Sequence, residues 1–281
     1  MIHKLGIEIP GHAMCRFHIE PSEGKITTAF IKGPDVKHIR NVLRLKPGDK
    51  IGLFDGTGLE YEAVIVKISS VTIEVSISHC FSTEAESPVQ IIVAQAFLKE
   101  KKMDRLVRQL VELGINQWIP FFAERSVSRP DQKRISVRIK RWEKIAAEAL
   151  KQCRRGSFME IGRAVSFKEV LNLGKPCGLK IAFWENETQP VDSALLPYPA
   201  HCDKIFIMMG PEGGFTIEEI KMARACGFVT ATLGPRILRA ETATIAACSL
   251  MQYLFGDMGK NILTKKGVSN SKLVPFGGGP R

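Results

Sequence analysis

The spacing of hydrophobic residues divides the chain into a β-rich part and a part in which strands alternate with helices. Residues 71–78 alternate between apolar and polar with a period of two, as in a strand that is buried on one face. Two further apolar runs, at residues 51–54 and 61–68, lie on either side of a glycine-containing turn at residues 55–58. Several short strands separated by turns predict a small β-barrel over residues 1–80.

The pattern changes after residues 81–88, whose polar composition predicts a linker. A continuous apolar run at residues 89–97 predicts a buried strand. The helix that follows has an apolar face made of Met103, Leu106, Val107, Leu110 and Leu113. Further strands are expected at residues 118–122, 178–184, 205–209 and 228–233, and further helices at residues 142–153, 166–173, 216–227 and 240–255. This alternation predicts a mostly parallel α/β domain over residues 89–259, and residues 260–281 are expected to be a disordered tail.

Two glycine-rich turns stand out in the α/β part. The first, Gly210-Pro211-Glu212-Gly213-Gly214, follows the strand predicted at residues 205–209. The second begins Leu233-Gly234-Pro235-Arg236 and leads into the last predicted helix. Glycine has no Cβ, so backbone at such turns can approach a ligand closely. Two of them in succession predict a small-molecule pocket built largely from main-chain groups.

Several other kinds of site are disfavoured by motifs that the sequence lacks. The strand at residues 89–97 leads into residues 98–102 without a glycine, whereas a dinucleotide-binding fold has its glycines there. There is no GxxxxGK[ST] loop, no HExxH and no CxxC among the seven cysteines, and only His201 of six histidines lies in the α/β part. We therefore expect no metal, no covalent nucleophile and reduced cysteines. Without a signal peptide or a membrane-spanning run, a cytoplasmic protein with no membrane partner is expected.

The positive charge of the chain is concentrated in one segment. The net charge is +11, and residues 99–163 contain 17 basic and 8 acidic side chains, whereas residues 1–80 contain 10 and 9. A concentrated basic segment is typical of proteins that bind a polyanion such as nucleic acid, and the alternative is an ordinary solvated helix face.

The glycine turns and their surroundings carry a family resemblance. The segment Gly210-Pro211-Glu212-Gly213-Gly214-Phe215 and the segment from Leu233 to Ala243, which reads LGPRILRAETA, resemble the two signature loops of the SPOUT superfamily of RNA methyltransferases. More narrowly, residues 14–256 resemble the bacterial 16S ribosomal RNA (uracil-N3)-methyltransferase family. Supporting segments are HIRNVLR at residues 38–44, ELGI at 112–115, ERS at 124–126 and the pairs Arg141-Trp142 and Gln152-Cys153. Three residues depart from the family pattern: Arg154 replaces a usual glycine, Met159 a common proline and Gln109 a frequent lysine.

The resemblance implies a fold, a reaction and partners. The expected fold is a PUA-like N-terminal barrel followed by a SPOUT-type α/β domain with a deep trefoil knot. The implied reaction is transfer of a methyl group from S-adenosylmethionine to N3 of a uridine in 16S ribosomal RNA of the small ribosomal subunit. A homodimer is also implied. Such a methyl transfer needs neither a metal nor an enzyme nucleophile, in agreement with the missing motifs.

The turns and the resemblance together yield the candidate binding residues. Those for the cofactor are Met209, Gly210, Pro211, Glu212, Gly213, Leu233, Gly234, Ile237, Leu238, Thr242 and Ala243. Those for RNA are Arg16, His38, Arg40, Arg44, Lys99, Lys102, Arg125, Arg155 and Arg236. Contacts from basic side chains to phosphates position an RNA without identifying its base, and the alternative for each is a solvated surface charge.

Two residues are candidates for the chemistry itself. Arg239 is expected to stabilise the negative charge that spreads onto the uracil carbonyl oxygens when N3 loses its proton, and Arg236 is the second choice. The alternative for both is phosphate positioning or a salt bridge with Glu241 or Glu212. Glu241 is the candidate base, although a carboxylate in the first turn of a helix also matches the helix dipole, and water is the other candidate.

Two other functions remain open from the sequence. One is a SPOUT enzyme that methylates a ribose 2′-oxygen or a purine, which the segment Arg239-Ala240-Glu241-Thr242 disfavours because ribose methylases usually have an asparagine-centred segment there. The other is an RNA-binding protein without catalysis, which the two intact glycine turns disfavour.

Overall fold

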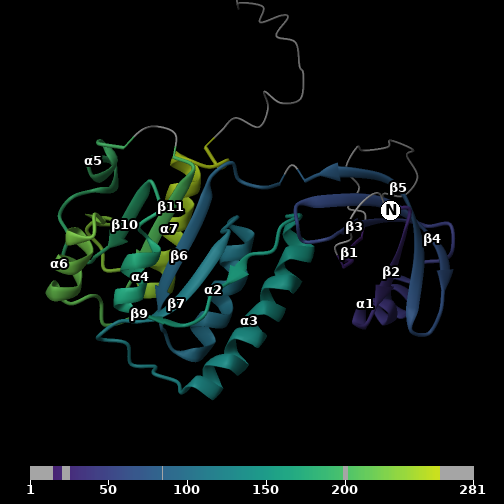
Figure 1. The fold of residues 1–281 in the computed structure, drawn as a ribbon, viewed down its shortest axis with the longest axis horizontal. Helices are drawn as coiled ribbons and strands as arrows, with labels where there is room; N and C mark the ends of the chain where they lie inside the picture. The colour runs from purple at the N-terminus through teal and green to yellow at the C-terminus, as the bar shows by residue number, and fades with distance from the viewer. Residues whose placement is uncertain (1–14, 21–25, 84, 199–201, 260–281) are drawn as a thin grey trace, which may run out of the picture.

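The computed structural model describes residues 15–20, 26–83, 85–198 and 202–259 (Figure 1). A β-rich N-terminal domain lies on the right of Figure 1, and an α/β domain lies on the left. The tail expected at residues 260–281 lies outside the described residues. The helices of the described ranges include none with both the length and the hydrophobicity that a bilayer crossing requires.

The N-terminal domain is built on a five-stranded sheet. Its strands, in the spatial order β1-β3-β4-β5-β2, are β1 (Arg16–His18), β3 (Lys50–Phe54), β4 (Leu59–Ile68), β5 (Thr72–Ser82) and β2 (Thr28–Lys32). Only the β1–β3 pair is parallel. In β5, Ile73 and Val75 are buried while their neighbours are more exposed, which confirms the predicted alternation. Because β5 continues to Ser82, the linker predicted from residue 81 begins inside a strand.

A short helical segment covers part of this domain. Helix α1 (Pro34–Lys37) continues into the π-helix η1 (His38–Leu43). Ile39 is buried beneath it, whereas His38 and Arg40 are exposed. Arg44 ends the segment with φ of 55°, in the left-handed region. This segment therefore presents basic side chains to solvent while the buried Val36 and Ile39 anchor it.

The α/β domain confirms the predicted parallel sheet. Its strands are β6 (Gln90–Ala96), β7 (Gln117–Phe122), β8 (Glu160–Ile161), β9 (Val165–Ser166), β10 (Leu179–Phe183), β11 (Lys204–Met209) and β12 (Val229–Ala231). They lie in the order β12-β10-β11-β6-β7-β8, with β9 also paired to β7, and every pair is parallel. The trefoil knot stays a prediction.

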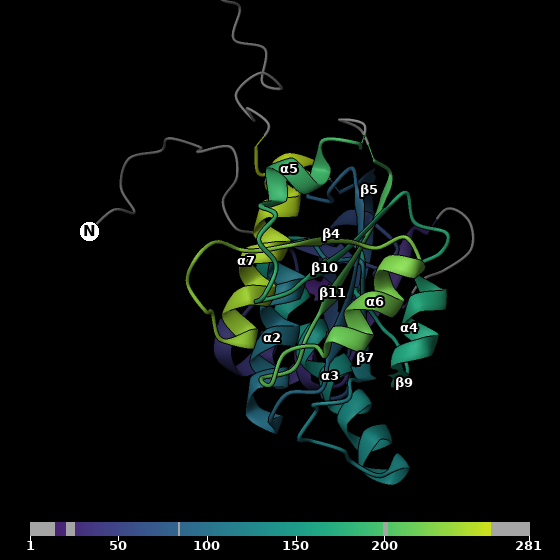
Figure 2. The same ribbon diagram turned by 90° about the vertical axis from the view of Figure 1, so that its left-hand side faces the viewer.

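Helices cover both faces of this sheet (Figure 2). They are α2 (Glu100–Glu112), α3 (Gln132–Cys153), α4 (Phe167–Leu173), α5 (Val191–Leu195), α6 (Ile217–Ala225) and α7 (Ala240–Leu254). One apolar core contains residues of α2, α3, α5 and α7, and the other contains residues of α4 and α6. A capping box starts α6, where the Thr216 hydroxyl accepts from the Glu219 N–H and the Glu219 carboxylate accepts from the Thr216 N–H.

The two domains contact each other around the end of α3. The Lys151 ammonium lies 3.0 Å from the Asp35 carboxylate of α1. Phe158, which follows α3, packs against the rings of His18 and Phe54 in the N-terminal sheet. The orientation of the N-terminal domain is therefore supported by charged and aromatic contacts in addition to the chain connection.

Candidate functional site

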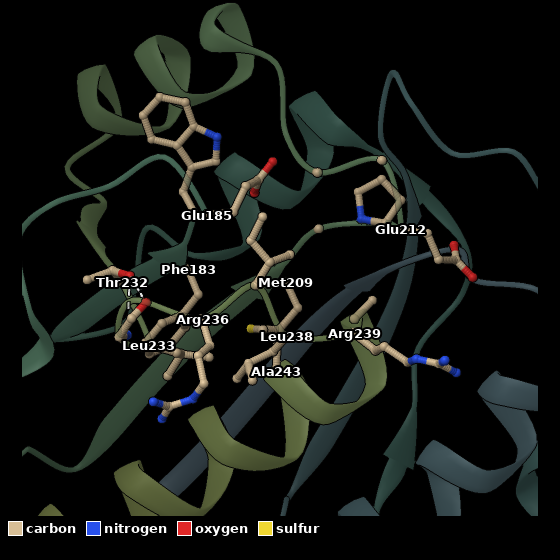
Figure 3. Close-up of a pocket in the computed structure, with 18 of the residues that line it drawn as sticks. Phe183, Glu185, Met209, Glu212, Thr232, Leu233, Arg236, Leu238, Arg239 and Ala243 are labelled. Atoms are coloured by element: carbon tan, nitrogen blue, oxygen red, sulfur yellow. Dashed lines mark hydrogen bonds between the residues drawn. The ribbon is translucent and has the colours of Figure 1, made fainter.

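A pocket of about 570 Å³ opens at one edge of the parallel sheet (Figure 3). Phe183, Met209 and Ala231 are the last residues of three adjacent strands, β10, β11 and β12. The carboxyl ends of parallel strands meet at one edge, and ligands of open α/β sheets bind there. Both glycine turns leave the sheet at this edge, so the structure brings together two segments about twenty residues apart in sequence.

The pocket contains nearly all of the predicted cofactor-binding residues. Those that line it are Met209, Gly210, Pro211, Glu212, Gly213, Leu233, Gly234, Ile237, Leu238 and Ala243. Thr242 does not line it, because the first turn of α7 turns this residue away. Gly214 and Gly234 have φ of +69° and +102°, in the region that favours glycine, and a Cβ on Gly214 would overlap the Glu185 carboxylate.

Sequence reasoning missed the third wall of the pocket, which follows β10. Phe183, Trp184 and Glu185 line it there, and the Arg224 guanidinium lies 6.0 Å from the centre of the Trp184 ring. No glycine marks this strand end. The available signal was the parallel arrangement itself, which predicts that the end of the strand at residues 178–184 meets the other two. Glu185 adds a second carboxylate to the pocket, in addition to that of Glu212.

Lys102 joins the two glycine turns at the pocket wall. Its ammonium lies 3.3 Å from Glu212 in the first turn and 3.0 Å from Glu241 at the start of α7. Burial acts to lower the pKa of Lys102, but contacts with Glu241 and Glu212 outweigh it and raise that pKa above its ordinary value. Burial acts to raise the pKa of Glu241, but its backbone N–H and Lys102 outweigh it and lower that pKa. Both side chains are therefore charged at neutral pH.

Arg236 and Arg239 both line the pocket, and their guanidinium groups point in different directions in Figure 3. Arg239 is the residue immediately before α7. Neither guanidinium forms a hydrogen bond or an ion pair with another residue of the described ranges. Of the alternatives expected from the sequence, a salt bridge with Glu241 or Glu212 is not formed by these two arginines; Lys102 contacts one oxygen of each carboxylate instead. Both arginines thus remain available to a bound anion.

The other candidate RNA contacts fall into two groups. His38, Arg40, Arg44 and Lys99 are exposed. Arg125 is also exposed, but its guanidinium donates to the Gly213 carbonyl at 3.1 Å, so it supports the first glycine turn. The other four lie on η1, directly after η1 and directly before α2, with their side chains exposed to solvent.

Arg155 and Arg16 require a correction, because their side chains are not available to RNA. Arg155 is 2% exposed, and its guanidinium donates to Glu86 and to the carbonyls of Val111 and Ile115 at 2.9 to 3.2 Å. The Arg16 side chain is 10% exposed and donates to Glu60 and to the Arg155 carbonyl, both at 2.9 Å. Both arginines instead join the domains and the segment between them.

One departure from the family pattern is explained by the backbone. Arg154, which stands where the family usually has glycine, follows α3 with φ of 65°. A left-handed residue is the common way to end a helix, and glycine adopts it without steric cost. The chain therefore keeps the backbone conformation that glycine would favour and places an exposed arginine there. Nothing in the structure explains the glutamine at position 109, which is exposed on α2.

The described residues include no cluster of three or more histidine, cysteine, aspartate or glutamate side chains that could hold a metal ion. The pocket is lined by main-chain groups, two carboxylates, one lysine and two arginines around apolar side chains. Volumes of this size are typical of sites for small organic molecules.

Comparisons with known proteins give consistent matches for both domains. A family model described as an RNA methyltransferase domain matches residues 85–252, and one described as an RNA methyltransferase PUA domain matches residues 31–78. Ribosomal RNA small subunit methyltransferase E of Bacillus subtilis is 30% identical over 247 residues, which are 85% of this chain and 96% of that protein. The protein of the same name from Buchnera aphidicola subsp. Schizaphis graminum is 34% identical over 223 residues, which are 79% of this chain and 88% of that protein.

Solved structures agree with the sequence matches. Ribosomal RNA small subunit methyltransferase E from Neisseria gonorrhoeae, solved with bound S-adenosyl methionine, superposes with a TM-score of 0.77 at 31% identity, covering 87% of this chain and 99% of that one. A Legionella pneumophila protein solved with bound SAM superposes with a TM-score of 0.78 at 29% identity, with the same coverage.

Proposed function

The chain belongs to the RNA methyltransferase family that includes ribosomal RNA small subunit methyltransferase E, and from this premise we propose that it methylates N3 of a uridine in 16S ribosomal RNA. The proposed methyl donor is S-adenosylmethionine. The observation that carries the proposal is the pocket formed by two glycine turns at the carboxyl ends of adjacent parallel strands. An enzyme acting on ribosomal RNA works in the cytoplasm, where we place this protein.

The residues of the pocket fit this donor. Its adenine edge carries donors and acceptors that main-chain groups of residues 209–214 and 233–238 can pair with. Gly213 and Gly214 have no room for a Cβ, which would meet Arg125 at the first position and Glu185 at the second. The donor is positively charged at sulfur and at its amino group, and the carboxylates of Glu185 and Glu212 line the pocket. When bound, S-adenosylmethionine supplies a methyl carbon that its positively charged sulfur makes electrophilic.

The proposed role of Arg239 is electrostatic. The uracil N3 lone pair forms the new N–C bond, the S–C bond breaks with its electrons remaining on sulfur, and the N3 proton leaves. Negative charge develops on the carbonyl oxygens beside N3 as the proton departs, and a guanidinium with fixed N–H groups stabilises such charge. Arg239 is available for this because Lys102 holds the neighbouring carboxylates.

The proton acceptor is proposed to be water. The pKa of Glu241 lies below its ordinary value, so this carboxylate is a weaker base than a free glutamate. Its ion pair with Lys102 at 3.0 Å also directs it toward the wall. Glu241 instead holds the start of α7 next to the first glycine turn through the shared lysine.

The nature of the product is the first prediction. Purified protein incubated with unmodified small ribosomal subunits and methyl-labelled S-adenosylmethionine should place the label in 3-methyluridine. The measurement is chromatography and mass spectrometry of the nucleosides after complete digestion of the RNA. A labelled 2′-O-methyl nucleoside or a methylated purine would establish the other SPOUT chemistry instead. Binding of RNA without any transfer from bound donor would indicate a non-catalytic RNA-binding protein.

The RNA is proposed to contact both domains. His38, Arg40 and Arg44 are exposed around η1, and the ion pair between Lys151 and Asp35 places this segment next to the end of α3. Along α3, Lys140 and Lys144 are exposed and one helical turn apart. Basic groups in this arrangement can contact consecutive phosphates, while Arg236 and Arg239 meet the target nucleotide at the pocket.

A homodimer is the second prediction, and the exposed apolar face of α7 supports it. Leu250, Tyr253 and Leu254 share one face of the helix and are 37%, 62% and 46% exposed, and Met258 just beyond it is 55% exposed. Such a cluster is typical of a protein interface. Light scattering should give twice the 31.2 kDa chain mass, and Tyr253→Glu should give the single-chain mass. A wild-type protein that stays at the single-chain mass at micromolar concentration would contradict this proposal.

A further inference from the structure

A buried glutamine lies directly beneath the pocket, between the two glycine turns. Gln95 is on β6, the strand that pairs with β11, and its register partner is Met209, which lines the pocket. The side chain is fully buried. Its amide nitrogen donates to the carbonyls of Gly210 and Ala96, both at 3.1 Å. One buried side chain thus determines the direction of the first carbonyl of the first glycine turn.

The other end of the same amide contacts the helix that follows the second turn. The Thr244 hydroxyl, also fully buried, lies 2.6 Å from the Gln95 side-chain oxygen and 2.9 Å from the Ala240 carbonyl. A hydroxyl has one hydrogen, and the shorter distance favours donation to Gln95. Ala240 lines the pocket one turn earlier on α7. Gln95 therefore connects Gly210 of the first turn to the start of α7 through the centre of the sheet.

We propose that Gln95 and Thr244 are positioning residues that hold the two glycine turns at the separation the donor requires. This inference rests on the proposed function, because the donor is the ligand whose affinity it concerns. Gly210 and Thr244 do not bond to each other. The side-chain amide of Gln95 links them, because it donates to the Gly210 carbonyl and accepts from the Thr244 hydroxyl. Lys102 links the same two segments at the surface through Glu212 and Glu241. The buried link is the more rigid because water does not compete with it.

The expected effect of losing this link is on donor binding. Thr244→Val keeps the shape of the side chain but leaves the buried Gln95 oxygen without a donor. The turns then populate other arrangements, and apparent affinity falls in proportion to the fraction that remains competent to bind. A competent fraction of about one tenth raises the Kd about tenfold. Bound donor restores the arrangement, so turnover at saturating donor should change less than about threefold by the same argument.

The chain offers a matched control on the same helix. Gln252 is 1% exposed, accepts from the Ser87 hydroxyl at 2.8 Å and donates to the Leu113 carbonyl at 2.8 Å. It repeats the chemistry of Gln95, but it lies eight residues after Thr244, about 12 Å further along α7 and away from the pocket. Ser87→Ala removes one hydroxyl donor from this second glutamine. It should lower thermal stability without changing donor affinity.

Calorimetry with S-adenosylmethionine tests the inference on full-length protein. Thr244→Val should raise the Kd about tenfold, whereas Thr244→Ser, which keeps the hydroxyl, and Ser87→Ala should stay within about twofold of wild type. This pattern distinguishes positioning from a general loss of stability, because Thr244→Val and Ser87→Ala each remove one donor to a buried glutamine. Equal Kd values for Thr244→Val and Ser87→Ala would overturn the inference.

Hydrogen exchange without ligand separates this inference from the proposed function. If wild-type protein binds no S-adenosylmethionine, the proposed donor is wrong, but the link between the turns is still measurable. Amides of residues 212–216 and 240–244 should then exchange at least about fivefold faster in Thr244→Val than in Ser87→Ala. The same exchange rates in both variants would overturn the proposal that Gln95 and Thr244 hold the turns together.

Discussion

Replacing Arg239 by alanine is expected to lower turnover about 100- to 1,000-fold while the Kd for S-adenosylmethionine changes less than about threefold. Arg239 lines the pocket at the start of α7, and its guanidinium has neither a hydrogen bond nor an ion pair within the described ranges. A group that stabilises charge only as the N3 proton leaves contributes to the transition state and not to donor binding. Single-turnover methylation of small subunits and calorimetry with the donor measure the two quantities separately.

Two further variants give this prediction its contrast. Arg239→Lys keeps a positive charge but loses the planar set of donors, so it should recover only part of the rate. Arg236 lies three residues earlier in the second turn, where its expected role is to position a phosphate. Arg236→Ala should therefore raise the KM for RNA more than it lowers kcat. If Arg239→Ala retains more than one tenth of the wild-type rate, Arg239 has no role in charge stabilisation. If Arg236→Ala has the larger effect on kcat, the two roles are exchanged.

The pocket is the part of the site that the sequence predicts best, because two of its walls are short continuous segments of the chain. Each glycine turn directly follows an apolar strand, and parallel strands bring both turns to one edge. Glu185 escaped prediction because β10 ends without a glycine or another turn signal. Gln95 escaped it for a different reason. A single polar residue within an apolar run gives no indication of whether its partners lie in the same strand or more than a hundred residues away, as Gly210 and Thr244 do.

The candidate RNA contacts were harder to predict than the pocket. A count of charges does not distinguish exposed arginines from buried ones. Arg40 and Arg44 are exposed as expected, whereas Arg155 is buried with four side-chain hydrogen bonds. Glu86 is its partner and lies in the polar segment between the domains. A polar segment of this kind normally predicts a solvated linker. Here the Glu86 carboxylate of that segment pairs with the buried Arg155 guanidinium, nearly seventy residues later in the chain.

Replacing Glu86 by alanine is expected to lower the free energy of unfolding by about 3 kcal/mol, because it leaves the Arg155 guanidinium buried without its counter-charge. The Arg155 side chain is 3% exposed, and its Nε and Nη2 atoms lie 3.2 and 3.0 Å from one Glu86 oxygen. The other Glu86 oxygen accepts from the backbone N–H groups of Gly156 and Ser157 at 3.0 and 2.9 Å. The substitution therefore removes one charge pair and leaves two backbone donors without their acceptor. Calorimetric unfolding should show a Tm lower by about 10 °C.

An exposed pair on the same side of the molecule serves as the control. Glu148 lies 3.1 Å from Lys151 but is 73% exposed, so Glu148→Ala should change the stability by less than about 1 kcal/mol. The difference between the two variants measures what burial adds to the interaction, since both remove a glutamate that pairs with a basic side chain near the end of α3. If Glu86→Ala and Glu148→Ala have the same small effect, Arg155 has no structural need for Glu86, and its earlier assignment as an RNA contact is open again. If only Glu86→Ala is destabilising, Arg155 is a structural residue that pairs with Glu86. The candidate RNA contacts are then the exposed basic residues of η1 and α3 and the two arginines of the pocket.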